Sequence, residues 1–213
     1  MTLHGSSGPL HSPRLLLRNY TPDDLDAVLA VYADPVVTAN FGLSPFTTET
    51  ARAFLAYAVG SSGRHPRTEY LIAVVSRARR DIIGCGRLAL DDHPNAEIGC
   101  VLRADHLNQG FGTEAVLLLL SLGFDHLRLH NIWGAIFPTN TLAASVAQKC
   151  GMTFEGILQN HSYIEGKWYD SAIYSILDHE WIGGVGRPKA RPHGSAWIQS
   201  SRAANVECQP EQP

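Results

Sequence analysis

The sequence lacks the features that mark a membrane-bound or secreted protein. The apolar run at residues 115–120 is far short of the ~20 residues that a membrane-spanning helix needs, and no other run comes near that length. Residues 1–13 are rich in Gly, Ser and Pro and carry no apolar core, so they do not resemble a secretory signal. We therefore expect a cytoplasmic protein with no membrane partner.

The chain also lacks the basic excess of a nucleic-acid binder and the cysteine spacing of a zinc site. Its formal net charge is −3, so we expect no nucleic-acid partner. Its four cysteines, Cys85, Cys100, Cys150 and Cys208, do not fall into metal-ligand pairs. We interpret them as reduced thiols and expect no metal. No Gly-Lys-Ser/Thr sequence occurs, which excludes a phosphate-loop ATPase.

What the chain does contain is enough apolar sequence for one domain. Hydrophobic residues make up 45% of the 213 residues. We place the domain at 12–182, after a loose lead-in at 1–11. The composition then shifts to Gly, Pro, Ser and scattered charge without periodicity, so we expect a flexible tail at 183–213.

Hydrophobic periodicity predicts helices and strands in mixed order. Thr21 and Pro22 begin a predicted helix that Asp34-Pro35 should stop, and Thr47 or Thr48 begins a second helix. Further helices are predicted at 113–127 and 140–150. Strands are predicted at 14–18, 69–76, 82–90, 97–102, 132–137, 152–159 and 168–177, and the second to fourth of these should form an antiparallel meander.

A glycine loop between a strand and a helix is the most informative stretch. The strand at 97–102 leads through a polar loop into Gly110-Phe111-Gly112, and an apolar helix follows. Glycine lets main-chain N–H groups approach a ligand, and a helix N-terminus favours an anion such as a phosphate. A tight turn without a ligand is the plain structural alternative.

A dinucleotide site is a further alternative for this loop. The dinucleotide fingerprint needs a third glycine where Ala115 stands, and alanine is tolerated there, so the residues leave this interpretation open. The loop lies in the middle of the chain, however, whereas a dinucleotide fold usually opens with its glycine turn. We therefore rank an oxidoreductase last.

The segment LNQGFGTEA, 107–115, resembles the acyl-CoA loop of the GNAT N-acetyltransferases, whose pattern is Arg/Gln-x-x-Gly-x-Gly/Ala. Leu107 departs from the first position, as in the branch that resembles ribosomal-protein N-terminal acetyltransferases (the Rim type). Residues 12–37 and 140–160 are similar to other parts of that branch, so the likeness covers roughly 12–178. It implies an α+β GNAT fold, with a mixed, mostly antiparallel sheet of six to seven strands and about four helices.

The resemblance also implies a site for acetyl-CoA as co-substrate. Main-chain N–H groups would hold the diphosphate, and we assign them to Asn108, Gln109, Gly110, Phe111, Gly112 and Thr113. Main-chain groups of Cys100, Val101 and Leu102 would pair with the pantetheine arm, at a strand edge opened by a bulge. Asn140 matches a family asparagine that contacts the pantetheine, and it is also a plain N-cap candidate.

Glu97 is our candidate catalytic base. A partly buried carboxylate at this point can take a proton from an amine, directly or through water. A solvent-exposed, structural Glu97 is an equally good interpretation. For Asp170 we favour a structural role, and we regard the histidines, His161 among them, as scattered.

The general acid is missing from its usual places, because the family's Tyr and Ser positions hold Ala147 and Ala143. Tyr163, Tyr169, Tyr174 or water could replace it.

We predict transfer of an acetyl group to a primary amine, most simply the α-amino group of a protein or peptide. That group has a pKa of about 7.7–8.0 against about 10.4 for lysine, so it needs less help to lose a proton. An antibiotic, polyamine or amino-acid acceptor stays open, as does a domain that binds acyl-CoA without transferring it. Dimers are common on this scaffold, and a homodimer stays open too.

Overall fold

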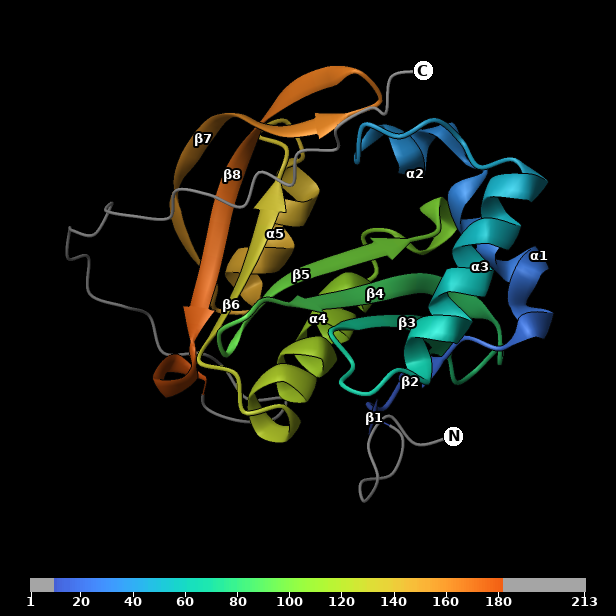
Figure 1. The fold of residues 1–213 in the computed structure, drawn as a ribbon, viewed down its shortest axis with the longest axis horizontal. Helices are drawn as coiled ribbons and strands as arrows, with labels where there is room; N and C mark the ends of the chain where they lie inside the picture. The colour runs from blue at the N-terminus through green and yellow to red at the C-terminus, as the bar shows by residue number, and fades with distance from the viewer. Residues whose placement is uncertain (1–9, 182–213) are drawn as a thin grey trace, which may run out of the picture.

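The computed structural model describes residues 10–181, which form one β-sheet with helices on both faces (Figure 1). The strand order is β1-β2-β3-β4-β5-β6-β8-β7, and every neighbouring pair is antiparallel except β5 and β6. The strands are β1 (Leu10–His11), β2 (Leu15–Asn19), β3 (Glu69–Ser76), β4 (Ile82–Leu90), β5 (Asn95–Leu102), β6 (Asn131–Ile136), β7 (Thr153–Ile164) and β8 (Lys167–Leu177). The sheet is therefore mixed and mostly antiparallel, as the sequence predicts.

The α-helices of residues 10–181 are α1 (Leu25–Tyr32), α2 (Pro35–Ala39), α3 (Thr48–Ser62), α4 (Phe111–Ser121) and α5 (Thr141–Lys149). Side-chain caps fix the starts of α3 and α5. The Thr47 hydroxyl accepts the Thr50 N–H at 3.2 Å, and the Asn140 side-chain oxygen accepts the Ala143 N–H at 3.0 Å. The predicted α+β class is confirmed, with eight strands instead of six to seven and with α2 as an additional helix.

Alternating side chains of the strands divide the core into two clusters. On β3, Tyr70, Ile72 and Val74 join the cluster that includes residues of α4 and α5. Leu71, Ala73 and Val75 join the cluster that includes residues of α1 and α3. Because successive side chains point to opposite faces, a strand that reads as a continuous apolar run is buried on both sides.

Two predicted element boundaries were wrong, and one helix was missed. α1 ends at Tyr32, before Asp34-Pro35, as predicted, but the Asp34 carboxylate accepts the Val36 N–H at 2.8 Å and so caps α2, which the sequence did not predict. The helix expected at 113–127 ends at Ser121 and continues as a π-helical turn at Leu122–His126. The strand expected at 152–159 extends to Ile164, and its two register shifts obscure the alternation on which the prediction relied.

The pair β5 and β6 opens the sheet near its middle (Figure 1). The two strands pair at three positions: Asn95 with Asn131, Ala96 with Ile132 and Glu97 with Trp133. Beyond Glu97 the two strands continue to Leu102 and Ile136 without pairing. The register between β4 and β5 is regular throughout, so the opening comes from divergence of the strands and not from the expected bulge.

The expected tail at 183–213 and most of the lead-in at 1–11 lie outside the described residues. The last two residues of that lead-in, Leu10 and His11, pair with β2 as the short strand β1. None of the helices within residues 10–181 is long and apolar enough to cross a membrane.

Candidate functional site

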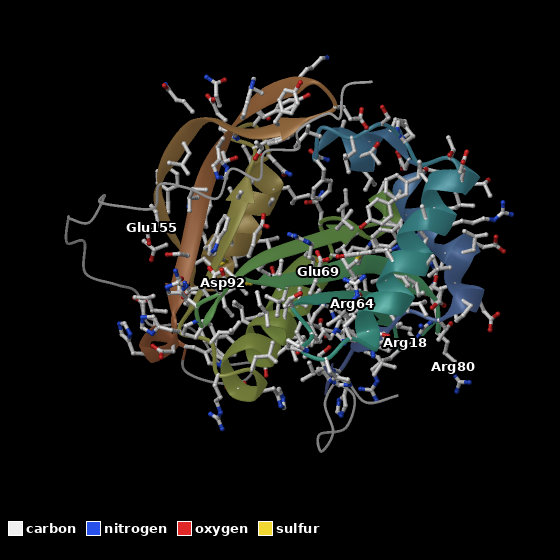
Figure 2. All side chains as sticks on the ribbon, in the orientation of Figure 1. Arg18, Arg64, Glu69, Arg80, Asp92 and Glu155 are labelled. Atoms are coloured by element: carbon white, nitrogen blue, oxygen red, sulfur yellow. The ribbon has the colours of Figure 1, made fainter. Side chains whose placement is uncertain are left out.

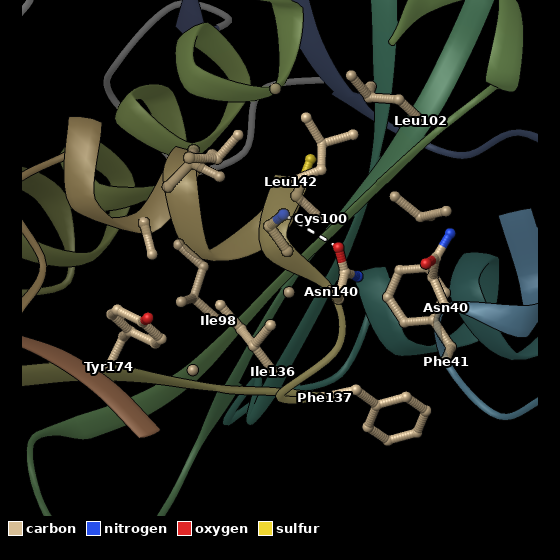
Figure 3. Close-up of a pocket in the computed structure, with 18 of the residues that line it drawn as sticks. Asn40, Phe41, Ile98, Cys100, Leu102, Ile136, Phe137, Asn140, Leu142 and Tyr174 are labelled. Carbon is tan, nitrogen blue, oxygen red and sulfur yellow. Dashed lines mark hydrogen bonds between the residues drawn. The ribbon is translucent and has the colours of Figure 1, made fainter. Parts of the chain in front are cut away.

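A cavity of about 430 Å³ lies where β5 and β6 diverge. Its walls come from the unpaired stretches of both strands, the loop before α4, the first turns of α5, and the β7–β8 hairpin. Figure 3 shows Ile98, Cys100 and Leu102 along one side and Ile136 and Phe137 along the other. The sequence predicts a site at the glycine loop, and the structure joins that loop to a cleft through the sheet.

Gly110 forms the turn that starts α4. Its φ is +79°, a left-handed conformation that suits glycine, and the preceding turn also holds Asn108 at φ +57°. The first N–H groups of α4 have no partner within the helix, as at any helix start. Among the expected contacts, Asn108, Gly110, Gly112 and Thr113 line the cavity. The loop therefore offers main-chain donors to an anion at one end of the cavity.

Arg14, just before β2, fastens this loop from outside. Its guanidinium donates to the Gln109 main-chain oxygen at 2.9 Å and to the Glu114 carboxylate at 2.6 Å, and it lies 4.4 Å from the centre of the Phe111 ring. The Ser12 hydroxyl donates to the same carboxylate. Burial alone would raise the pKa of Glu114, but the bonds from Ser12 and Arg14 outweigh it and hold that pKa below its usual value.

Main-chain groups of β5 alternate between the two edges of the strand. The Arg103 N–H donates to the Ile83 oxygen on β4 at 2.9 Å. Alternation then turns the groups of Val101 towards β4 and those of Cys100 and Leu102 towards the open edge. A Cβ on Gly84 of β4 would meet the Val101 oxygen, in agreement with this assignment. The open edge therefore offers the groups of Cys100 and Leu102, and those of Val101 are engaged with β4.

Two predicted residues show their side chains in the cavity. Asn140 lines it while its side-chain oxygen caps α5, the bond drawn dashed in Figure 3. Cys100 also lines it, and burial raises the pKa of its thiol to about 12. The thiol is therefore neutral at physiological pH and is not an activated nucleophile.

Glu97 lines the cavity at the point where β5 and β6 separate. Its carboxylate accepts from Arg87 at 2.7 Å, and Arg87 also donates to Glu69 at 2.7 Å. Tyr57 of α3 donates to Glu69, so this chain lies on the α3 side of the sheet, where Figure 2 shows Glu69. Burial lowers the pKa of Arg87, but its two carboxylate partners outweigh burial and raise it. Within residues 10–181, Glu97 is the only acidic residue that lines the cavity.

The three candidate tyrosines lie in different places. Tyr174 lines the cavity from β8, opposite Gly134 of β6. Ala143 and Ala147 of α5 line the cavity too, so the usual acid positions face it with methyl groups. Tyr163 is 61% exposed at the hairpin end, and Tyr169 stacks on Phe137 with ring centres 4.7 Å apart. Only Tyr174 of the three contributes to the cavity wall.

A clasp, formed by Ser44 and Glu165, joins the loop after α2 to the β7–β8 hairpin. The Ser44 main-chain N–H and hydroxyl, from the loop after α2, donate to the two Glu165 oxygens at 3.0 and 2.7 Å. Glu165 lies in the turn between β7 and β8. The same loop comes close to the hairpin at Gly42, where a Cβ would lie about 3.3 Å from the Tyr169 ring. Within residues 10–181, no cluster of His, Cys, Asp and Glu is arranged to hold a metal ion.

Sequence alone gave no signal for the partnership of Arg14 and Glu114 or for the clasp. The two residues of each contact are 100 and 121 residues apart in the chain, so no local spacing links them. The glycine loop, in contrast, was found because all its residues are consecutive.

Comparisons with known proteins match most of the domain that contains this site. A family model described as an acetyltransferase (GNAT) domain matches residues 14–153. An uncharacterized N-acetyltransferase, p20 of Bacillus licheniformis, is 27% identical over 175 residues, which span 82% of this chain and 98% of the relative.

Two solved structures share the fold but differ in the acceptor that their names give. The ribosomal-protein-S5-alanine acetyltransferase of Vibrio fischeri superposes with a TM-score of 0.67 at 20% identity, covering 83% of this chain and all of that one. The spermidine N-acetyltransferase of Vibrio cholerae, solved with CoA and spermine, gives 0.67 at 22% identity, covering 79% and 98%. At these identities the likeness shows the fold and not the acceptor.

Proposed function

The chain belongs to the GNAT acetyltransferase family and is an acetyl-CoA-dependent N-acetyltransferase, and from this premise we propose that it acetylates the α-amino group of a peptide or protein. One observation carries the choice of acceptor. Within residues 10–181, Glu97 is the only carboxylate that lines the cavity, whereas a polyamine with several cationic nitrogens would be better matched by several carboxylates. A terminal α-amine brings a single cation.

We assign acetyl-CoA to the glycine loop and the open strand edge. The loop and first-turn N–H groups, from Asn108, Gln109, Gly110, Phe111, Gly112 and Thr113, bind the diphosphate. The pantetheine arm pairs with the free main-chain groups of Cys100 and Leu102 as an added strand would, and Asn140 borders it. The fit of these residues rests on donors that have no partner within the sheet or the helix.

Glu97 receives the acceptor in this proposal. The amine binds beside its carboxylate and loses a proton to it, directly or through water, and Arg87 fixes the carboxylate in place. The neutral nitrogen then attacks the thioester carbon, forming the C–N bond while the carbonyl electrons move to oxygen. A main-chain N–H at the open edge of β5 stabilises that oxyanion.

The adduct then collapses: the carbonyl re-forms, the sulfur leaves with the electron pair of the C–S bond, and the nitrogen gives its second proton to water to become a neutral amide. The departing thiolate takes a proton. Tyr174 is positioned to donate it, because its side chain lines the cavity and Ala143 and Ala147 have no proton to give. Water then carries the proton released by the nitrogen to the phenolate. A CoA thiol is already a fair leaving group, so this assistance is modest.

Release of free thiol with a panel of acceptors tests the function. The panel contains short peptides with free N-termini, the same peptides blocked at the N-terminus, spermidine, free lysine and an aminoglycoside. Free peptides should give the highest kcat/KM and blocked peptides none. Faster turnover of spermidine or the aminoglycoside would refute the proposed acceptor, and no turnover with any amine would favour a domain that only binds acyl-CoA.

A further inference from the structure

A bulge in β7 carries two of the three side chains on which this inference depends. Leu158 pairs with Ser171 and Ser162 pairs with Tyr169, so β7 uses two more residues than β8 over this stretch. The extra chain includes Asn160, which is in the left-handed region at φ +47°. Its N–H donates to the Asp170 carboxylate at 2.9 Å, so Asp170 stabilises the bulge. Bulges redirect side chains, and they occur often beside active sites.

Two side chains of the bulge and one of β8 form a compact polar cluster, which we define as His161, Ser162 and Ser171. The His161 Nδ1 lies 3.1 Å from the Ser171 hydroxyl, and the two hydroxyls are 3.1 Å apart. Ser162 lies 3.4 Å from the same nitrogen. Ser171 is 1% exposed, yet both serines line the cavity, while His161 is exposed and is not one of the lining residues. The imidazole therefore contacts the hydroxyls of two serines that line the cavity.

The chemistry of the polar cluster fits a peptide group. A hydroxyl both donates and accepts a hydrogen bond, and a peptide unit presents one N–H and one C=O. A polyamine chain between its nitrogens presents only methylenes. Other side chains that line the cavity, including Phe41, Phe137 and Ile164, are apolar and suit the side chain of an N-terminal residue.

The polar cluster also lies at a suitable distance from Glu97. Ala172 pairs with Ile136, which places Ser171 opposite Phe137, four residues along from the Trp133 that pairs with Glu97. At ~3.3 Å a residue, the two positions are ~13 Å apart along the sheet. The side chains of both ends reach into the cavity, so the space between them spans an amine and the first peptide groups that follow it.

We propose that Ser162 and Ser171 bind the first peptide groups of the acceptor and that His161 is a positioning residue that orients the Ser171 hydroxyl. The inference rests on the proposed function, since it takes the acceptor to be a peptide N-terminus. The polar cluster then gives the enzyme its preference for a peptide over a simple amine with the same reactive nitrogen.

The test compares two acceptors in each variant: a tetra-alanine peptide and isopropylamine, which keeps the branched carbon but has no peptide group. Ser171→Ala should lower the ratio of their kcat/KM values about 5-fold, and the Ser162→Ala/Ser171→Ala double variant about 20-fold, the size expected for one and two lost hydrogen bonds. Turnover of isopropylamine and KM for acetyl-CoA should stay unchanged.

Variants of His161 separate orientation from mere packing. His161→Asn keeps an acceptor atom near the place of Nδ1 and should retain most of the ratio, whereas His161→Phe should lose as much as Ser171→Ala. Ser175→Ala is the matched control, because Ser175 is also a buried serine of β8 but donates to Glu155. It should leave the ratio unchanged.

Failure of this inference differs from failure of the proposed function. If the wild-type enzyme prefers isopropylamine or a polyamine to every peptide, both proposals are overturned by that measurement alone. If the wild type prefers peptides but the serine and His161→Phe variants lower both acceptors equally, the acceptor stands and the recognition by the polar cluster is refuted.

Discussion

Arg14 and Glu114 are joined by a two-point contact across 100 residues of sequence. The Arg14 side-chain Nε donates to one carboxylate oxygen of Glu114 at 2.6 Å, and the Arg14 main-chain N–H donates to the other at 3.1 Å. Because Arg14 also holds the Gln109 oxygen, the start of β2 fixes the shape of the loop that we assign to the diphosphate. The contact links the edge of the sheet to the loop that binds the donor.

Stability at acid pH should depend on Glu114. The pKa of its carboxyl is held below its ordinary value of 4.5 by Ser12 and Arg14 despite burial. A depressed pKa in the folded state adds stability above the unfolded value, and that stability disappears as pH falls through the folded value. Glu114→Gln should therefore be less stable than wild type at pH 6, and the gap should close below pH 4.5.

Chemical denaturation of wild type and Glu114→Gln from pH 6 down to pH 3 measures that gap. A difference between wild type and Glu114→Gln that is constant over the whole range would contradict the assignment.

Gly110 should be essential for binding of coenzyme A. Valine disfavours a φ of +79°, so Gly110→Val should deform the loop and raise the Kd for CoA about 10-fold or more. Calorimetric titration measures the change. Gly60→Ala is the control, since nothing lies within 4 Å of a Cβ at that position, and it should bind CoA as wild type does. Normal affinity in Gly110→Val would remove the loop from the proposed site.

Glu97→Gln should slow the reaction without weakening the donor. Glutamine keeps the size of the side chain but cannot take a proton, so kcat should fall about 10- to 100-fold. The Kd for CoA should stay within about twofold, because Glu97 is not among the residues that we assign to the diphosphate or the pantetheine arm. Asp92→Asn, in an exposed turn, is the control. Unchanged kcat in Glu97→Gln would show that another group takes the proton.

Tyr174→Phe should lower kcat about 10-fold while leaving the Kd for CoA unchanged, because phenylalanine fills the same space but has no proton to donate. Stopped-flow thiol release under saturating acetyl-CoA measures the chemical step. Tyr163→Phe is the matched control, since Tyr163 lies on the exposed hairpin end. Equal rates for Tyr174→Phe and wild type would leave water as the donor.

The sequence predicts elements whose residues lie close together in the chain and misses those that depend on distant partners. The glycine loop and the α3 start at Thr47 follow from local turn and capping chemistry. The divergence of β5 from β6 could not be predicted, because each strand alone has an ordinary pattern. The resemblance to the Rim-type branch predicted the fold, whereas only the structure shows the unpaired edge of β5 to which we assign the donor.

His161 shows why the rest of the site was missed. In the sequence it is one of several scattered histidines, and only the bulge around Asn160 places it against Ser171. The interpretation of Asp170 as structural agrees with its bond to the Asn160 N–H. A bulge has no reliable signature in a single sequence, since the extra residue disturbs the very alternation by which strands are recognised.

The unpaired stretch of β5 leaves a gap in the hydrogen bonding between two strands of the sheet. On our assignment, acetyl-CoA occupies that gap as a temporary ninth strand and forms the missing main-chain hydrogen bonds while it is bound. Binding of the donor would then complete the hydrogen bonding at this edge, and release of CoA would open it again. Saturating CoA should therefore raise the melting temperature. Bound CoA would also reduce the motion of the β7–β8 hairpin relative to the rest of the molecule.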